Sequence, residues 1–158
     1  MNLNVGVYYL REWNPEAAIH HFGIAVKDKQ LESKSRTYLG IASKQREEYE
    51  MAEHQFKRVL ALSPKNITPQ LHLAEIYMRE GREKEAEVEA RRITELLMAD
   101  RKLFSQVIDL IVKQGNRGDV CLSRELLLPL FSRSLENGSN DEMREEMKKM
   151  IDNLINIR

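Results

Sequence analysis

The sequence repeats itself every 34 residues, and this period limits the fold more than any other feature of the chain. When the chain is shifted against itself by that distance, three units align without a gap. Small residues and bulky apolar residues recur at fixed places in these units. The small ones are Gly6, Gly40, Ala74 and Ala18, Ala52, Ala86, and the apolar columns are Val5, Leu39, Leu73 and Phe22, Phe56, Ala90. Such a period indicates supersecondary units that stack to bury a shared core.

The small residues indicate closely packed helices. Glycine inside a helix costs about 1 kcal/mol relative to alanine, so Gly6 and Gly40 suggest that a neighbouring helix approaches closely. We expect the alanine column to face the first small column, so that two antiparallel helices pack at the short end of the usual spacing of roughly 8–10 Å. The bulky columns then fill the gaps between successive hairpins.

Helix start and stop signals agree with hairpins of this size. Asn14-Pro15-Glu16 and Thr68-Pro69 each place a capping residue before a proline at the first helical position. Ser63-Pro64 separates the second unit from the third, and Gly81 and Gly115 suit the ends of first helices. The predicted helices are 2–12, 15–28, 33–46, 49–62, 68–80 and 83–98.

These columns resemble the tetratricopeptide repeat, whose motif is followed by Val5-Gly6-x-x-Tyr9, Leu39-Gly40 and Leu73-Ala74-x-x-Tyr77. Ala18-x-x-x-Phe22 and Ala52-x-x-x-Phe56 follow it in the second helices. The resemblance covers about residues 1–100, and it departs from the motif at the tryptophan column. It implies an all-α, right-handed solenoid of antiparallel helix pairs, whose first helices line a concave groove for a peptide or a partner helix.

Beyond residue 100 the register continues weakly. We expect 101–114 and 119–136 to form a degenerate fourth hairpin, with Gly118 and Asp119 as turn and N-cap. Pro129 should kink or split the second helix, because it removes a hydrogen bond and clashes with the preceding turn. Ser139-Asn140-Asp141-Glu142 opens an amphipathic capping helix at about 140–157. The chain then forms one domain, with repeats at about 1–32, 33–66, 67–100 and 101–136.

Composition excludes several classes of partner. The 25 basic and 25 acidic residues cancel, so the chain has no global attraction for nucleic acid or for an anionic membrane. The single cysteine, Cys121, excludes a disulfide framework. No apolar run approaches the roughly 20 residues of a membrane span, and the N-terminus lacks the pattern of a signal peptide. We therefore expect a cytoplasmic protein without membrane insertion, or a fragment of a longer chain.

The sequence carries no motif for catalysis, for a cofactor or for a metal ion. His20 and His21 are adjacent, so on a helix they point about 100° apart, and His54 and His72 lie on other predicted helices. No phosphate-binding glycine loop, nucleophile elbow or Cys-x-x-Cys pair is present. We expect packing or surface roles for the histidines, a buried apolar role for Cys121, and no enzymatic activity.

The concave groove is therefore the candidate site, and it implies a non-catalytic scaffold that binds another protein. In this register Tyr38 and Ile41 offer an apolar contact, and Arg11, Lys44 and Arg79 are able to hold carboxylates. The pattern with which some family members grip an acidic chaperone tail is missing. The predicted groove residues are Asn4, Val7, Arg11, Lys34, Tyr38, Ile41, Lys44, His72, Glu75 and Arg79.

Two other functions stay open at this point. The stripe of Met143, Met147 and Met150 on the last helix and the incomplete first repeat favour self-assembly through the C-terminal helix or the open N-terminal end. The alternative is an accessory domain of a larger enzyme or of a membrane-associated protein, with the chemistry located elsewhere in the longer chain.

Overall fold

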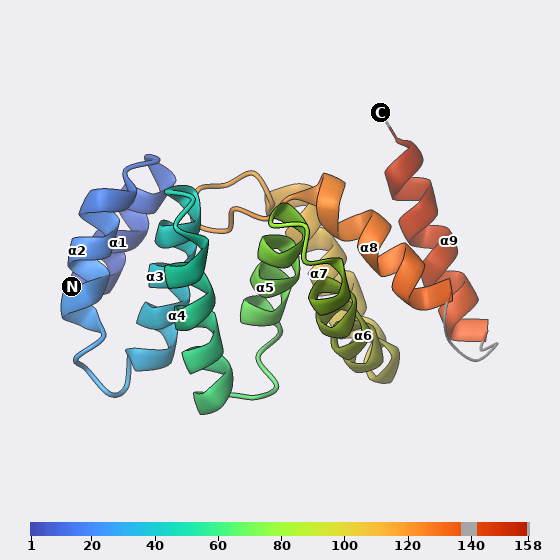
Figure 1. The fold of residues 1–158 in the computed structure, drawn as a ribbon, viewed down its shortest axis with the longest axis horizontal. Helices are drawn as coiled ribbons and strands as arrows, with labels where there is room; N and C mark the ends of the chain where they lie inside the picture. Colours follow the sequence, from blue (N-terminus) through green and yellow to red (C-terminus); the bar gives the residue numbers. More distant parts are fainter. Residues whose placement is uncertain (137–141, 158) are drawn as a thin grey trace.

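The computed structural model describes residues 1–136 and 142–157, and the regular structure of these residues is entirely α-helical (Figure 1). The helices, in chain order, are α1 (Asn2–Arg11), α2 (Pro15–Ala25), α3 (Glu32–Gln45), α4 (Tyr49–Leu62), α5 (Ile67–Arg79), α6 (Glu83–Ala99), α7 (Arg101–Gln114), α8 (Arg124–Glu136) and α9 (Glu142–Asn156). The first six agree with the predicted ranges to within one helical turn, and the all-α class is confirmed. Within the described ranges, no helix is both long enough and apolar enough to cross a membrane.

The first six helices form three pairs that stack in chain order along the long axis of the molecule (Figure 1). α1 packs against α2, α3 against α4, and α5 against α6, and each pair joins the next through its second helix. The first helices also touch one another, α1 with α3 and α3 with α5. We call the surface formed by α1, α3 and α5 the inner face. The right-handed sense of the stack stays a prediction.

Aromatic rings fill the gaps between successive pairs, as predicted from the bulky columns. Phe22 of α2 stacks on Tyr38 of α3 with ring centroids 5.3 Å apart, and Phe56 of α4 stacks on His72 of α5 at 4.9 Å. The glycine column faces these rings rather than the alanine column, because a Cβ at Gly40 would come within 2.6 Å of the Phe56 ring. Glycine therefore makes room for the phenylalanine of its own pair.

One kind of turn joins the two helices of each pair. Trp13, Glu47 and Gly81 stand one repeat apart, and their backbones are left-handed, with φ of 54°, 61° and 71°. In the first turn the amide of Asn14 donates to the carbonyl of Tyr9 at 2.9 Å, and the same bond recurs one and two repeats later. Such a left-handed residue commonly ends a helix. Gly115, the expected fourth member, has φ of −55°, so the periodic turn is not continued there.

The fourth unit departs from the prediction. Residues 115–123 are not helical, and α8 begins at Arg124 instead of near residue 119. α8 packs mainly against α6 and α9 and makes little contact with α7, so the expected pairing of 101–114 with 119–136 as a hairpin is wrong. Of the predicted kink or split at Pro129, the split is wrong, because α8 continues through this residue as one helix, and the kink stays a prediction.

The C-terminal helix covers α8. Met147 and Ile151 are the buried residues of α9, which packs against α8 in the place expected of a capping helix. The predicted capping residues Ser139, Asn140 and Asp141 lie outside the described residues. Apart from the fourth hairpin, the division of the chain into one domain with repeats at about 1–32, 33–66 and 67–100 stays a prediction.

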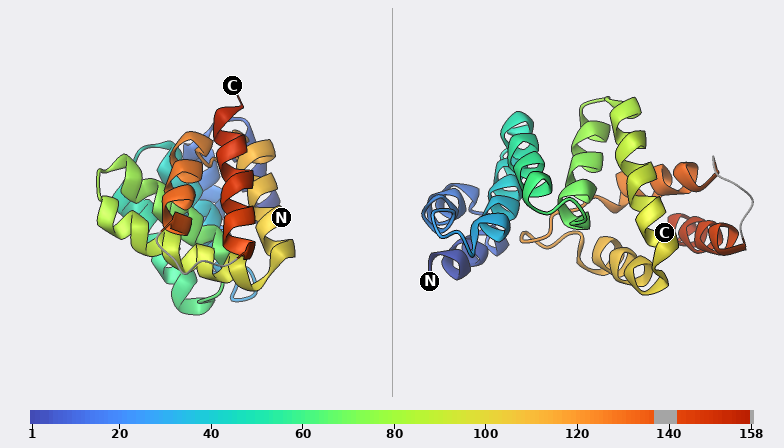
Figure 2. Two further views of the ribbon diagram at one scale, coloured as in Figure 1. Left: turned by 90° about the vertical axis from the view of Figure 1, so that its right-hand side faces the viewer. Right: turned by 90° about the horizontal axis from the view of Figure 1, so that it is seen from below.

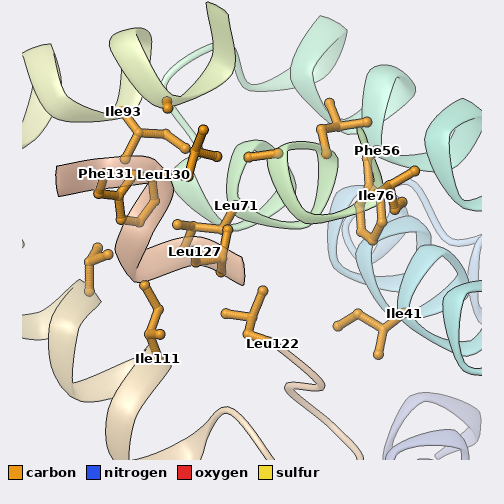
Figure 3. Close-up of a cluster of buried hydrophobic side chains, with 14 of the residues drawn as sticks. Ile41, Phe56, Leu71, Ile76, Ile93, Ile111, Leu122, Leu127, Leu130 and Phe131 are labelled. Atoms are coloured by element: carbon orange, nitrogen blue, oxygen red, sulfur yellow. The ribbon is translucent and has the colours of Figure 1, made fainter. Parts of the chain in front are cut away.

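The apolar core is continuous from the helix pairs to α8. Figure 3 shows Leu122, from the non-helical segment before α8, in the same cluster as Ile41, Ile111 and Leu127. Leu122 is only 2% exposed, so this segment contributes to the core although it has no regular structure.

Candidate functional site on the inner face

The predicted groove residues all lie on the three first helices, but only some of them are exposed. Asn4, Val7 and Arg11 lie on α1, Lys34, Tyr38, Ile41 and Lys44 on α3, and His72, Glu75 and Arg79 on α5. The expectation of exposure is wrong for four of them, because Ile41, Lys44, His72 and Glu75 are at most 4% exposed. Tyr38 and Val7 are half-buried, and Asn4, Arg11, Lys34 and Arg79 are exposed.

A segment of the chain itself covers the buried part of the inner face. We call residues 115–123 the inner loop. It leaves the end of α7, turns back along the first helices, and returns to the start of α8 (Figure 2). The amide nitrogen Nε2 of Gln45 donates to the carbonyl of Gly118 at 2.7 Å, and a Cβ at Gly118 would collide with the carbonyl of Leu10. The loop backbone thus lies directly on the C-terminal end of α1.

An ion pair fixes the tip of the inner loop to the first helix. Nε of Arg11 donates to Oδ2 of Asp119 at 2.9 Å, although the two residues are 108 positions apart in sequence. Arg117 binds the same carboxylate from within the loop, at 3.1 Å and 3.0 Å. Burial raises the pKa of Asp119, but the hydrogen bonds from Arg11 and Arg117 outweigh burial and lower the pKa below its ordinary value. Asp119 therefore forms ion pairs with Arg11 and Arg117, and the prediction that it is a helix N-cap is wrong.

A buried network lies beneath the loop. Nζ of Lys44 lies 2.7 Å from Oε2 of Glu75 and 3.0 Å from Nδ1 of His72, and it also donates to the carbonyl of Cys121. Nε of Arg79 donates to Oε1, the other carboxylate oxygen of Glu75, at 2.8 Å. Buried charges are tolerated when they are paired and hydrogen-bonded in this way. The network therefore joins α3, α5 and the inner loop.

His72 is neutral in this network. Burial, and then the positive charge of Lys44, hold the pKa of His72 well below its usual value. An ammonium group has only donors, so Nδ1 of His72 accepts from Lys44 and the ring proton sits on Nε2. Nε2 has no hydrogen-bond partner among the described residues. His72 is fully buried, and its Nε2 is one of several buried side-chain atoms without a partner among the described residues.

The inner loop divides the inner face into two hollows. One, of about 420 Å³, has Lys34, Tyr38 and Ile41 of α3 on one side and Thr68 and His72 of α5 on another, with the inner loop as a wall. The other, of about 350 Å³, is lined by Trp13, Arg79 and Cys121 among others. We call the first hollow the open pocket. It combines an apolar wall with the exposed ammonium group of Lys34, which is the composition of a ligand site.

Sequence reasoning missed the part played by residues 115–123. The sequence predicts that Gly118 is a turn residue and that Asp119 is a helix N-cap, because local sequence indicates only such local roles. Cys121 was expected to be a small buried residue, but it is half-buried, with a left-handed φ of 50° and a carbonyl that accepts from Lys44. Burial raises the pKa of its thiol, so the thiol is protonated rather than nucleophilic at neutral pH. Among the described residues there is no cluster of His, Cys, Asp and Glu able to hold a metal ion.

Comparison with known proteins agrees with the helix pairs. The family model described as tetratricopeptide repeat matches residues 45–103, which run from the end of α3 through α4, α5 and α6 to the start of α7. No curated protein matched the chain. The matched segment holds the third pair and the helix before it, in which the left-handed turn, the small residues and the aromatic stacking recur at the repeat spacing. Residues 45–103 of the chain are therefore similar to the tetratricopeptide repeat family.

Proposed function

We propose that this protein is a non-catalytic scaffold that binds a peptide or a partner helix on its inner face. Tetratricopeptide repeats generally mediate protein–protein interaction, which supports the class of function. The observation that carries the proposal is the open pocket of about 420 Å³ on the inner face, which Lys34, Tyr38 and Thr68 line among others. A cytoplasmic location and partners other than nucleic acid are predictions from the sequence that belong to the same proposal.

The chemistry of the open pocket fits a peptide. Tyr38, which is half-buried, supplies an apolar surface for one side chain of the ligand. Lys34 is exposed at the rim, where a positive charge favours an acidic residue and speeds encounter. Asn4, Val7 and Arg11 on α1 and Arg79 on α5 belong to the same inner face but do not line the open pocket.

A displayed library of random peptides, selected on the full chain, tests the proposal without knowledge of the natural partner. The affinity of selected peptides is then measured by calorimetry for the protein and for two variants, Tyr38→Ala and Lys34→Glu. We expect each variant to bind at least about tenfold more weakly, which corresponds to the loss of one good contact. Unchanged affinity in both variants would show that the peptides bind elsewhere and would contradict the proposal.

Matched controls separate a local effect from a general one. Tyr8→Ala removes another tyrosine, which is 59% exposed on α1 and does not line the open pocket. Lys102→Glu makes the same change of charge on α7, also away from the pocket. Both should leave peptide affinity unchanged, and all four variants should keep the helical circular dichroism of the parent protein.

Self-association is a second candidate, favoured by exposed apolar residues on the first pair. Tyr8 and Trp13 are 59% and 58% exposed, and Ile24 of α2 is 41% exposed. The open end of a repeat array is a natural stacking surface. Light scattering over a range of concentrations decides this point. A dimer that Trp13→Ser or Ile24→Glu dissociates would support it, and a monomer at every concentration would exclude it.

A further inference from the structure

The inner loop is held as a bound ligand is held, by side chains of helices that are distant in sequence. Arg11 binds its carboxylate, Gln45 binds the carbonyl of Gly118, and Lys44 binds the carbonyl of Cys121. All three helix residues lie on the inner face. Three anchors to polar atoms are more than a connection between α7 and α8 needs.

The loop also places an apolar side chain into the core. Leu122, three residues after Asp119, is almost fully buried and lies in one cluster with Ile41 of α3 and Leu127 of α8 (Figure 3). Protein segments commonly bind one another through two kinds of anchor, a carboxylate paired with an arginine and a leucine buried in an apolar pocket. The inner loop has both.

Departure of the loop would leave no charged group without a partner. Lys44 keeps its ion pair with Glu75, and Glu75 also keeps Arg79, because neither contact involves the loop. Asp119 keeps Arg117, which belongs to the loop itself. Arg11 is 57% exposed, so water replaces the lost carboxylate. The polar contacts of the loop are therefore exchangeable, unlike those of a buried pair that depends on one partner.

Two further features favour exchange. Cys121 has a left-handed backbone that is unfavourable for a residue with a side chain, so the bound loop carries local strain. Hollows of about 420 Å³ and 350 Å³ flank the loop, so a competing segment can reach the inner face from either side while the loop is in place.

We propose that the inner loop is a displaceable, built-in occupant of the inner face, and that it competes with a partner segment that carries an acidic residue followed three positions later by a leucine. The proposal rests on the proposed function, because it names the chemistry of the partner and the element that limits access to it. In the free protein the loop covers Lys44 and Gln45, and only the open pocket is available. A partner with matching anchors replaces the loop and gains the whole inner face.

The test uses the full chain and a fluorescein-labelled peptide with the sequence of residues 114–124, under reducing conditions. Gly118→Ala should push the loop off the inner face, because the added methyl collides with the carbonyl of Leu10. Its control is Gly23→Ala, where an added Cβ meets nothing within 4 Å. A second, milder variant is Asp119→Asn, which weakens the hold of Arg11, and its control is Asp109→Asn on α7.

We expect fluorescence anisotropy to show that the peptide binds Gly118→Ala about tenfold more tightly than it binds the parent protein, with a smaller gain for Asp119→Asn. The two control variants should match the parent protein. A peptide carrying Asp119→Asn and Leu122→Ala should lose the gain. Equal binding to Gly118→Ala and to its control would overturn the proposal. Loss of helical structure in Gly118→Ala would overturn it as well, because the loop would then be an integral part of the fold.

Comparison with the peptide library separates the two proposals. Library ligands that depend on Tyr38 but bind Gly118→Ala and the parent protein equally would leave the function intact and refute displacement. The opposite result is binding of the loop peptide to Gly118→Ala without any library ligand for the parent protein. It would support the proposal that the inner loop is displaceable and would refute the open pocket as the binding site.

Discussion

Nζ of Lys44 lies 2.7 Å from a carboxylate oxygen of Glu75, and the two side chains are 2% and 1% exposed. The pair joins α3 to α5 across the inner face, and the same ammonium binds His72 and the inner loop. A buried ion pair stabilises little relative to apolar residues, yet the loss of one partner is costly, because the other charge stays buried.

Replacement of Lys44 by methionine should therefore destabilise the protein by about 3–5 kcal/mol. The double variant Lys44→Met with Glu75→Gln should recover a large part of this loss, because no carboxylate is then left without its ammonium. Urea unfolding followed by circular dichroism measures both values. The exposed lysine on α7 gives the control, Lys102→Met, which should change stability by less than about 0.5 kcal/mol. If Lys44→Met and Lys102→Met changed the free energy of unfolding equally, the ion pair between Lys44 and Glu75 would not be a buried, stabilising contact.

Gly40→Ala should destabilise the protein, although alanine is the better helix former. The added methyl would come within 2.6 Å of the Phe56 ring, which is fully buried and cannot move aside freely. Overpacking of about 1–3 kcal/mol then exceeds the gain of about 1 kcal/mol in helix propensity. Gly23→Ala, where nothing lies within 4 Å, should have the opposite sign. Thermal unfolding of the two variants checks the difference in sign.

Glu47→Gly should stabilise the protein by roughly 0.5–1 kcal/mol, because Glu47 has a left-handed backbone that glycine adopts without a steric penalty. Gly81→Ala, at the equivalent place one repeat later, should destabilise it by a similar amount. Glu50→Gly on α4 serves as the control, since glycine in a helix is unfavourable. Denaturant unfolding measures the change. A lower free energy of unfolding in Glu47→Gly would mean that contacts of the Glu47 side chain stabilise the protein more than its left-handed backbone destabilises it.

The stability of the protein should fall in acid partly through Glu53. Hydrogen bonds from Arg82, then Lys57 and Tyr77, lower the pKa of Glu53 from 4.5 to about 2, against the effect of burial. A carboxylate whose pKa is lowered in the folded protein stabilises the fold when the pH is above the pKa that the carboxylate has in the unfolded chain. This stabilisation is lost as the pH falls from 4.5 towards 2.

The variant Glu53→Gln should therefore be less stable than the parent protein at pH 6, and the difference should shrink steadily below pH 4.5. Urea unfolding at a series of pH values measures it. Glu50→Gln on the same helix controls for the loss of a carboxylate, since Glu50 is exposed. A difference that stays constant down to pH 3 would exclude Glu53 as a source of acid sensitivity.

The helix pairs were predictable because their signals are local and recur. Gly40, Ala52 and Phe56 lie within one unit, and the same pattern at the next shift repeats the information. Even so, the partner of Gly40 was misjudged, because a repeat column shows that a position is special without showing which atoms it meets. α8 also continues through Pro129 while it packs against α6 and α9, which local sequence did not indicate.

The site was predictable only in part. The helix faces of the groove residues follow from the register, but the exposure of Lys44 and Glu75 depends on what covers them. That cover is the inner loop, which occurs once and meets α1 through a contact between Arg11 and Asp119, 108 residues apart. No periodic signal marks such a contact. The closest sequence clue is that Val120 and Arg124 depart from the repeat motif just where the loop replaces a helix.

The contact between Arg11 and Asp119 also changes how the chain should fold. In an open repeat array each unit contacts only its neighbours, so the ends can unfold independently. Here the first pair is fastened to a segment that follows the seventh helix, which raises the contact order of the chain. Such a closure slows folding, since a long stretch of chain must be ordered before the contact forms. While the loop is bound, it also couples the first pair to the segment that leads into α8, so that the first pair unfolds less readily by itself than the end of an open array.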